Sequence, residues 1–240
     1  MRDWRLQATA KVAQDAILPG GGFAPAGTDI TAASMSILKK SNVLLTVHVP
    51  NATALFFNIA HRTFVEARSL FDKHELGRHT KNRREFFMPE ADAMAYMELM
   101  LEAVITAHTG IEAYANEAVP GGYVYTYWDK RTKKDVSLNR EEIERRLTLC
   151  QKLGDVLPKA YSVPVPKGKS AWHGYQQLKH IRDRIMHMKA IDRKPTGPDI
   201  ESVWDTLFRL DSPLLLARPI VEHFAGRIDP KPGWFGRLPA

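Results

Sequence analysis

The clearest hydrophobic pattern in the chain lies between residues 90 and 118. Apolar side chains recur there every three or four positions, which is typical of one face of an amphipathic helix. The stripe consists of Met97, Leu101, Val104, His108, Ile111 and Ala115. Pro120, Gly121 and Gly122 follow it, and residues of this kind end a helix. The pattern therefore predicts a long helix over 90–118.

A second amphipathic stretch runs from Ala171 to about Ala190, with Ser170 as its expected N-cap. Its apolar stripe consists of Leu178, Ile181, Ile185 and Met188. Each of the two stripes is too narrow to hold a helix stable alone in water. We therefore expect these two long helices to pack against each other.

Three further stretches show helical spacing after a capping residue or a chain break. They run from Thr53 to about His74, from Asn139 to about Leu157, and from about Ile200 onward, where Pro213 and Pro219 kink or divide the helix. Two short stretches have β character: NVLLTVHV at 42–49 reads as a strand, and YVYTYWDKRTKKD at 123–135 as a small hairpin or an ordered loop.

These patterns predict a mainly all-α fold, a bundle of four to five helices over 53–229. A loop-rich extension with one strand precedes it at 1–52, and a non-helical tail follows at 230–240.

Composition narrows the class of protein. The chain has 240 residues, of which 44% are hydrophobic and 25% charged, which is typical of a globular protein and argues against disorder. Its single cysteine, Cys150, excludes an internal disulfide and a cysteine-rich zinc site. MRDWRLQATA at the start has no apolar core of signal-peptide length, and polar residues interrupt the most apolar region, 43–60. We expect a cytoplasmic protein without a membrane span.

The net charge favours a polyanion partner. The formal charge of +7 suits RNA, DNA or nucleotides, and it suits a merely basic surface equally well. The glycines at 20–22 lack the Gly-Lys-Ser/Thr that a phosphate loop needs. His173, His180 and His187 are seven residues apart, roughly 10 Å along a helix, which is too far for one metal. We expect no metal and no cofactor.

The stretch LKHIRDRIMHMK at 178–189 carries the chemistry. Outside its apolar stripe it is dense in titratable and cationic groups: His180, Arg182, Asp183, Arg184, His187 and Lys189. Histidine exchanges protons near neutral pH, and arginine binds phosphate through permanent charge and several donors. Together they can cleave RNA without a metal, by proton transfer and by stabilising the charged transition state. The alternative is a solvated, charged helix face.

The segment from Arg182 to His187 resembles the signature of the HEPN superfamily, which is Arg, four to six residues, then His. The polar residue that usually follows the arginine is Asp183 here, where asparagine is more common. An upstream aromatic, Trp172, and the stretch IEAYANE at 111–117 also resemble members of this family. In layout the resemblance covers residues 54–228.

The resemblance implies a helical, usually dimeric bundle. Many members are metal-independent endoribonucleases of toxin–antitoxin, phage-defence or RNA-processing systems, often with an antitoxin or regulatory partner. Others are non-catalytic binding or assembly modules, and an unrelated helical interaction protein is a further alternative. The resemblance makes Arg182 and His187 the catalytic pair and places Asp183 at the orienting position. The negative charge of Asp183 opposes the binding of a phosphate at this site.

Helix geometry adds a constraint on the pair. Residues five apart on a regular helix point about 140° away from each other, so Arg182 and His187 flank the helix rather than share a face. We therefore expect a two-fold homodimer whose interface includes 178–189 and gathers both residues from two subunits. His180 and Arg184 are better aligned on one helix and form an alternative pair.

Supporting groups are expected nearby. Glu112 and Asn116, four residues apart, either orient the arginine or histidine of the facing helix or serve solubility and capping. Two basic clusters either contact the RNA backbone or are solvated connectors. They contain Arg78, Lys81, Arg83, Arg84, Lys130, Arg131, Lys133 and Lys134.

Overall fold

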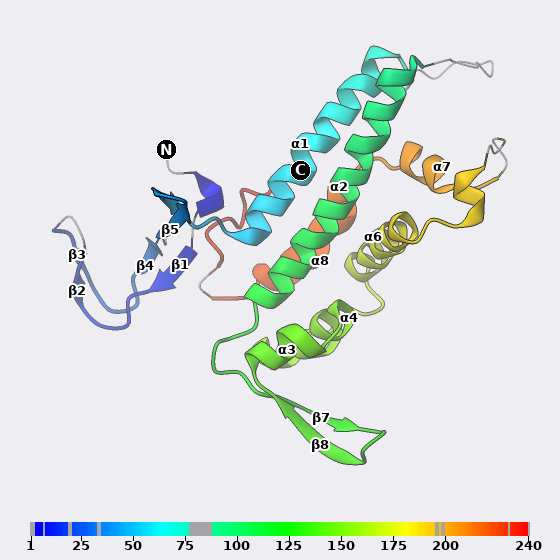
Figure 1. The fold of residues 1–240 in the computed structure, drawn as a ribbon. Coiled ribbons are helices and arrows are strands. Elements are labelled where there is room, and N and C mark those ends of the chain that lie inside the picture. Colours follow the sequence, from blue (N-terminus) through cyan, green and yellow to red (C-terminus); the bar gives the residue numbers. More distant parts are fainter. Residues whose placement is uncertain are drawn as a thin grey trace. The chain divides into compact units, whose positions relative to one another are not determined.

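Helices dominate the fold, accompanied by small two-stranded antiparallel sheets (Figure 1). The structure is a computed structural model, and it describes residues 3–6, 8–18, 21–32, 35–76, 88–194, 197, 200–229 and 231–239. The expectation of a mainly helical chain is therefore confirmed.

The α-helices follow one another along most of the chain. They are α1 (Ala52–Lys73), α2 (Glu90–Glu117), α3 (Arg140–Arg146), α4 (Leu149–Gln151), α5 (Leu157–Tyr161), α6 (Ser170–Met186), α7 (Val203–Phe208) and α8 (Pro213–Ala225). A π-helical turn at Lys152–Val156 joins α4 to α5, and 3₁₀ turns lie at Trp4–Leu6 and Ala190–Arg193.

The strands pair as four antiparallel hairpins or ladders. They are β1 (Ala8–Lys11) with β4 (Asp29–Ala32), β2 (Ala16–Ile17) with β3 (Phe23–Ala24), β5 (Met35–Lys40) with β6 (Val43–His48), and β7 (Tyr125–Asp129) with β8 (Lys134–Leu138). The strand expected at 42–49 is confirmed as β6, and the hairpin reading of 123–135 is confirmed as β7–β8. The N-terminal segment holds more strands than its sequence indicated: β1 pairs with β4 and β2 with β3, although glycine and proline flank β3 and disfavour strands.

The chain forms two compact units. The first consists of Met1–Leu55, Ala113–Pro166 and Val221–Leu238, and the second of Phe56–Glu112, Lys167–Ile220 and Pro239–Ala240.

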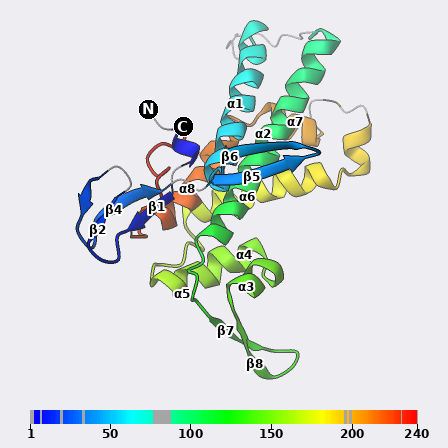
Figure 2. The same ribbon diagram turned by 60° about the vertical axis from the view of Figure 1, so that its left-hand side comes forward.

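The second unit is built on α1 and α2, which run side by side in both ribbon views (Figures 1 and 2). At one end of the pair the Phe71 ring lies 6.4 Å from that of Tyr96. At the other end the buried Phe57 ring packs against Gly110, where no side chain intervenes. Glycine at this position lets the two helices approach closely.

α6 buries the stripe that its sequence predicts. Leu178, Ile181 and Ile185 are buried, and the helix contacts α2 through Tyr175 and Arg182. α6 begins at Ser170 itself, so the expected capping role of Ser170 is wrong: the N-cap position belongs to Lys169, which makes no side-chain cap bond. The helix also ends at Met186 instead of 190.

The first unit has its own core. The Trp234 ring meets Tyr114 edge-on at 5.8 Å, and both side chains are fully buried. Lys152 is buried there too. Its ammonium group donates hydrogen bonds to Asn116 Oδ1 at 2.7 Å and to the Glu144 carbonyl at 2.9 Å. These bonds replace hydrogen bonds to water that the ammonium group loses on burial.

The predicted cap at Asn139 is confirmed. Its side chain accepts from the Glu142 N–H and the Glu142 carboxylate accepts from the Asn139 N–H, which is a capping box. The prediction of one helix from there to Leu157 is wrong, because α3 ends at Arg146. Thr148 begins a new capping box by accepting from the Gln151 N–H, and a capping residue has extended backbone that interrupts a helix.

Two other boundaries differ from the sequence pattern. At α1 the capping side chain is that of Asn51, which accepts from the Ala54 N–H, while the Thr53 hydroxyl donates to Glu117 instead. The helix expected from about Ile200 is divided: α7 ends at Phe208 and α8 begins at Pro213. Proline fits the first helical turn, where its missing N–H costs nothing.

The contact between Gly110 and Phe57 yields a test of the α1–α2 packing. A Cβ at position 110 would lie 2.4 Å from Cδ2 of Phe57, so Gly110→Ala overpacks a buried contact. We expect the free energy of unfolding to fall by about 1–3 kcal/mol, measured by urea denaturation. Gly121→Ala is the control, because nothing lies within 4 Å of its Cβ. Equal stability of the two variants would contradict the close packing.

Candidate functional site

The charged stretch of α6 meets α2 at one buried histidine. Nη2 of Arg182 lies 3.2 Å from Nε2 of His108, which comes from the apolar stripe of α2 and is 2% exposed. Arginine can only donate, so Nε2 of His108 is the acceptor and its ring proton sits on Nδ1. The His108 ring also stacks on Tyr175 with 6.3 Å between centroids. These contacts hold the imidazole in one tautomer and orientation.

The electrostatics of this contact keep His108 neutral. Burial lowers the pKa of His108 to about 4, and the positive charges of Arg182 and Lys179 add to that effect against the opposing charge of Asp183. A protonated imidazole would confront the guanidinium with a like charge in a poorly solvated place. The histidine is therefore an acceptor at neutral pH.

Asp183 balances the charge of the arginine. Its Oδ1 lies 2.9 Å from Nη1 of Arg182, and its other oxygen accepts a hydrogen bond from Lys179 one turn earlier. Burial acts to raise the pKa of Asp183, but the Lys179 hydrogen bond and the Arg182 charge outweigh it and hold the pKa below its usual value. Asp183 is thus an ionised carboxylate shared between two cations.

His187 lies where α6 ends. It is the C-cap residue, its backbone N–H donates to the Asp183 carbonyl at 3.0 Å, and its side chain is exposed. With φ −125° and ψ 54° it has left the helical conformation. The 140° separation expected for a regular helix therefore does not apply to His187.

Arg184 has a different environment from Arg182. Its Nη2 lies 2.9 Å from Oδ1 of Asp192, whose side chain is fully buried, and it also donates to the Glu201 carbonyl. Asp192 accepts two backbone N–H groups as well, from Lys189 and Val203. Burial acts to raise the pKa of Asp192, and these bonds more than offset it. This ion pair joins the end of α6 to the start of α7.

The remaining polar candidates have other environments. His180 and Glu112 are exposed on α6 and α2. Asn116 belongs to the first unit, where it accepts from Lys152. The structure places His108, one helical turn before Glu112, against Arg182 instead.

Of the two basic clusters, one lies within the described residues. Lys130, Arg131, Lys133 and Lys134 are exposed at the turn of the β7–β8 hairpin, and Trp128 beside them is 58% exposed. Arg78, Lys81, Arg83 and Arg84 lie outside the described residues.

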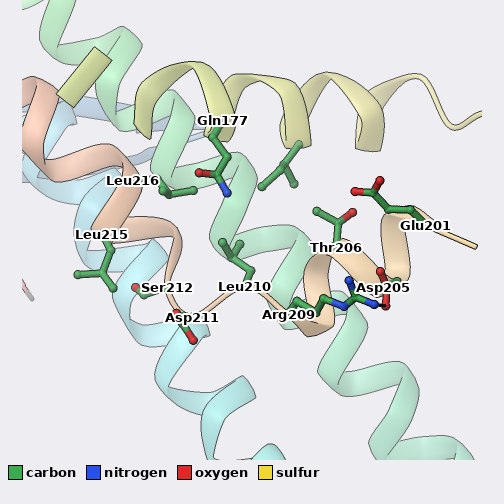
Figure 3. Close-up of a pocket in the computed structure, with 11 residues that line it drawn as sticks. Gln177, Glu201, Asp205, Thr206, Arg209, Leu210, Asp211, Ser212, Leu215 and Leu216 are labelled. Atoms are coloured by element: carbon green, nitrogen blue, oxygen red, sulfur yellow. Dashed lines mark ion pairs between the residues drawn. The ribbon is translucent and has the colours of Figure 1, made fainter. Parts of the chain in front are cut away.

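A pocket of about 410 Å³ opens elsewhere in the second unit (Figure 3). Gln177 points toward it from α6, and Asp205 and Arg209 lie side by side at its other end, 3.1 Å apart. Its lining holds none of the residues from Arg182 to His187. Asp205 neutralises Arg209 there, so the guanidinium charge is already compensated.

Two absences concern the part of the chain that the structure describes. No group of three or more His, Cys, Asp or Glu side chains there could hold a metal ion. No described helix combines the length and the apolar character needed to cross a membrane.

The chain has no match among protein families, curated proteins or solved structures.

The sequence pattern missed the role of His108. It counted this residue as one more member of the α2 stripe, among methionine, leucine, valine and isoleucine. The available signal was its polarity, because an imidazole inside an apolar stripe needs a partner. The pattern did not indicate the pocket, because its lining includes residues 209–212, where the expected helix is divided.

The low pKa of His108 makes stability depend on pH. In the unfolded chain His108 binds a proton below about pH 6.5, whereas in the folded chain it does so only near pH 4. The contribution of neutral His108 to the free energy of unfolding is therefore complete above pH 6.5 and is lost as the pH falls to 4. Its upper limit is about 3 kcal/mol. His108→Gln keeps an acceptor without the titration, so its free energy of unfolding should vary less between pH 7 and 4.5.

Urea denaturation at several pH values measures this difference. His180→Gln, at an exposed histidine of α6, is the control and should keep the wild-type pH dependence. If His108→Gln and the wild type lose stability in parallel over this window, His108 is not held neutral by burial.

Proposed function

We propose that this chain is a metal-independent endoribonuclease with a HEPN-type helical bundle, in which Arg182 and His187 act on the RNA phosphate. The observation that carries the proposal is the anchored position of Arg182. Its guanidinium is held on one side by neutral His108 and on another by Asp183, while its side chain stays 29% exposed. A guanidinium has five N–H donors, so these contacts leave donors for phosphate oxygens.

His187 supplies the proton transfer in this proposal. It takes the proton of the ribose 2′-OH, the 2′-oxygen attacks the adjacent phosphorus, and the bond to the 5′-oxygen breaks as the imidazolium so formed gives its proton to that oxygen. The products are a 2′,3′-cyclic phosphate and a 5′-OH end. Arg182 stabilises the extra negative charge of the transition state. The exposed position of His187 at the end of α6 leaves its ring accessible to RNA.

Asp183 occupies the position where asparagine is more common in the HEPN superfamily, and its contacts limit the effect of its negative charge. Lys179 and Arg182 both contact this carboxylate, so its negative charge is compensated locally. That compensation reduces its repulsion of a phosphate. In the proposal two copies of α6 approach around a two-fold axis, which gathers two arginines and two histidines.

A second candidate is a non-catalytic module of the same fold. The observation that favours it is that both terminal nitrogens of Arg182 bond to protein groups, as in a purely structural arginine. The two candidates differ in what the loss of His187 does, because His187 is exposed and its side chain contributes little to packing.

His187→Ala should abolish detectable RNA cleavage, because loss of a proton-transfer group typically costs about 10²–10⁴ in rate. Arg182→Lys should also be impaired, since a point charge does not replace a fork of donors. The assay incubates purified protein with mixed RNA, with and without excess EDTA, and identifies cyclic phosphate ends. EDTA should change nothing.

His173→Ala is the matched control, because His173 is another exposed histidine on α6 and should leave cleavage unchanged. Thermal unfolding checks that every variant remains folded. Equal cleavage by wild type and His187→Ala, or no cleavage by either, would contradict the endoribonuclease proposal and favour the non-catalytic module.

The β7–β8 hairpin is the RNA-binding surface in this proposal. Its four turn cations attract phosphates, and Trp128 offers a ring on which an unpaired base can stack. Replacing Lys130, Arg131, Lys133 and Lys134 by alanine should reduce the slope of log Kobs against log salt for single-stranded RNA by up to about 3. Trp128→Ala should weaken binding by about 1–3 kcal/mol.

Fluorescence anisotropy at several salt concentrations measures both effects. Val124→Ala, at a 56% exposed apolar residue just before β7, is the control and should bind as the wild type does. An unchanged salt slope in the fourfold variant would show that RNA does not contact this turn.

A further inference from the structure

The β5–β6 hairpin exposes an unusual amount of apolar surface. Six of its large apolar side chains are half or more exposed: Met35, Ile37, Leu38, Val43, Leu44 and Leu45. The other exposed large apolar residues among the described part of the chain are spread over many elements. Contiguous exposed apolar surface of this kind marks an interaction site.

The register shows that both faces of the hairpin are apolar. Residues directly opposite in an antiparallel pair share a face, so Ile37 lies beside Thr46 on one face and Leu38 beside Leu45 on the other. A sheet with one wet face would alternate apolar and polar residues. Apolar residues on both faces are typical of strands in the interior of a larger assembly, and a lone two-stranded hairpin is only marginally stable in water.

The two edges of the hairpin differ. β5 ends in Lys39 and Lys40, and lysine on an edge strand discourages pairing with another chain. β6 runs VLLTVH, without a lysine, an acidic residue or a proline inside the strand. The described residues contain no third strand paired with this hairpin. β6 is therefore an open edge of the kind that accepts another strand.

We infer that β6 pairs edge to edge with β6 of a second copy of this chain, forming a four-stranded antiparallel sheet. In this pairing the two-fold axis is perpendicular to the sheet, so the same face of both hairpins points to the same side. Residues that face each other across the axis are therefore both odd-numbered or both even-numbered. An axis through Leu45 brings Leu45 against its own copy and Val43 against Val47, with Leu44 against Thr46. No charged side chains meet across this pairing, and Lys39 and Lys40 stay on the outer strands.

The hairpin tip favours this partner over a lipid surface. Ser41 and Asn42 form the turn, Lys40 and Lys39 lie next to it opposite Val43 and Leu44, and the other apolar residues lie behind them. Insertion of the tip into a membrane would have to bury these polar groups first, which costs free energy. Sideways pairing leaves them in water. This inference is independent of RNA cleavage, because β6 contains none of the residues assigned to that reaction.

The test is the mass of the full chain in solution, measured by light scattering over a range of concentrations. The wild type should form particles of an even multiple of 27.1 kDa. Leu45→Lys places two like charges across the axis and should halve the particle mass, with the dissociation constant raised at least ~10-fold. Leu45→Glu should do the same. An equimolar mixture of the two variants should restore the wild-type mass, because lysine then faces glutamate.

Leu215→Lys is the matched control, since Leu215 is 62% exposed where Leu45 is 56% exposed, and it should keep the wild-type mass. A monomeric wild type, or an unchanged mass in Leu45→Lys, would overturn the inference. So would a mixture that stays at the mass of the single variants. Sedimentation with phosphatidylglycerol vesicles covers the lipid alternative: a monomeric wild type whose vesicle binding is lost in Leu45→Glu would assign the hairpin to membranes.

Discussion

The hydrogen bond from Arg182 to buried His108 is the contact on which the candidate site depends. An arginine beside a buried imidazole is tolerable only while the imidazole is neutral, because two like charges in a poorly solvated place repel strongly. Burial itself enforces that neutrality by lowering the pKa of His108 to about 4. The same contact sets how α6 lies against α2, so the position of the arginine and the packing of the two helices are one constraint.

Charge compensation continues along α6. Lys179 and Arg182 share Asp183, and Arg184 pairs with buried Asp192 beyond the end of the helix. Because Lys179, Arg182 and Arg184 each contact a carboxylate, the repulsion among these cations is reduced. These pairs hold both sides of the last helical turn, and His187 extends from that turn into solvent. The proposed chemistry therefore combines an arginine held by protein contacts with an exposed histidine at the end of the helix.

The β5–β6 hairpin differs from α6 because many of its exposed side chains are apolar. Its lysines lie next to the turn, and large apolar side chains are exposed on both faces. In the helical parts, apolar side chains pack against other helices of the same chain, as Phe57 of α1 does against Gly110 of α2. A second chain is the simplest source of the missing neighbour for the hairpin, because a strand edge without charged residues is complementary to itself.

Local sequence signals determined much of the fold. The apolar period of α2 and the proline after it defined that helix to within a residue of its end, and Asn139 was predicted correctly as the residue that caps α3. The end of α6, the break before Thr148 and the role of His108 were decided by tertiary contacts. His108 and Arg182 are 74 residues apart in the chain, and the energy that keeps one neutral and the other in place arises only when the helices that carry them are packed together.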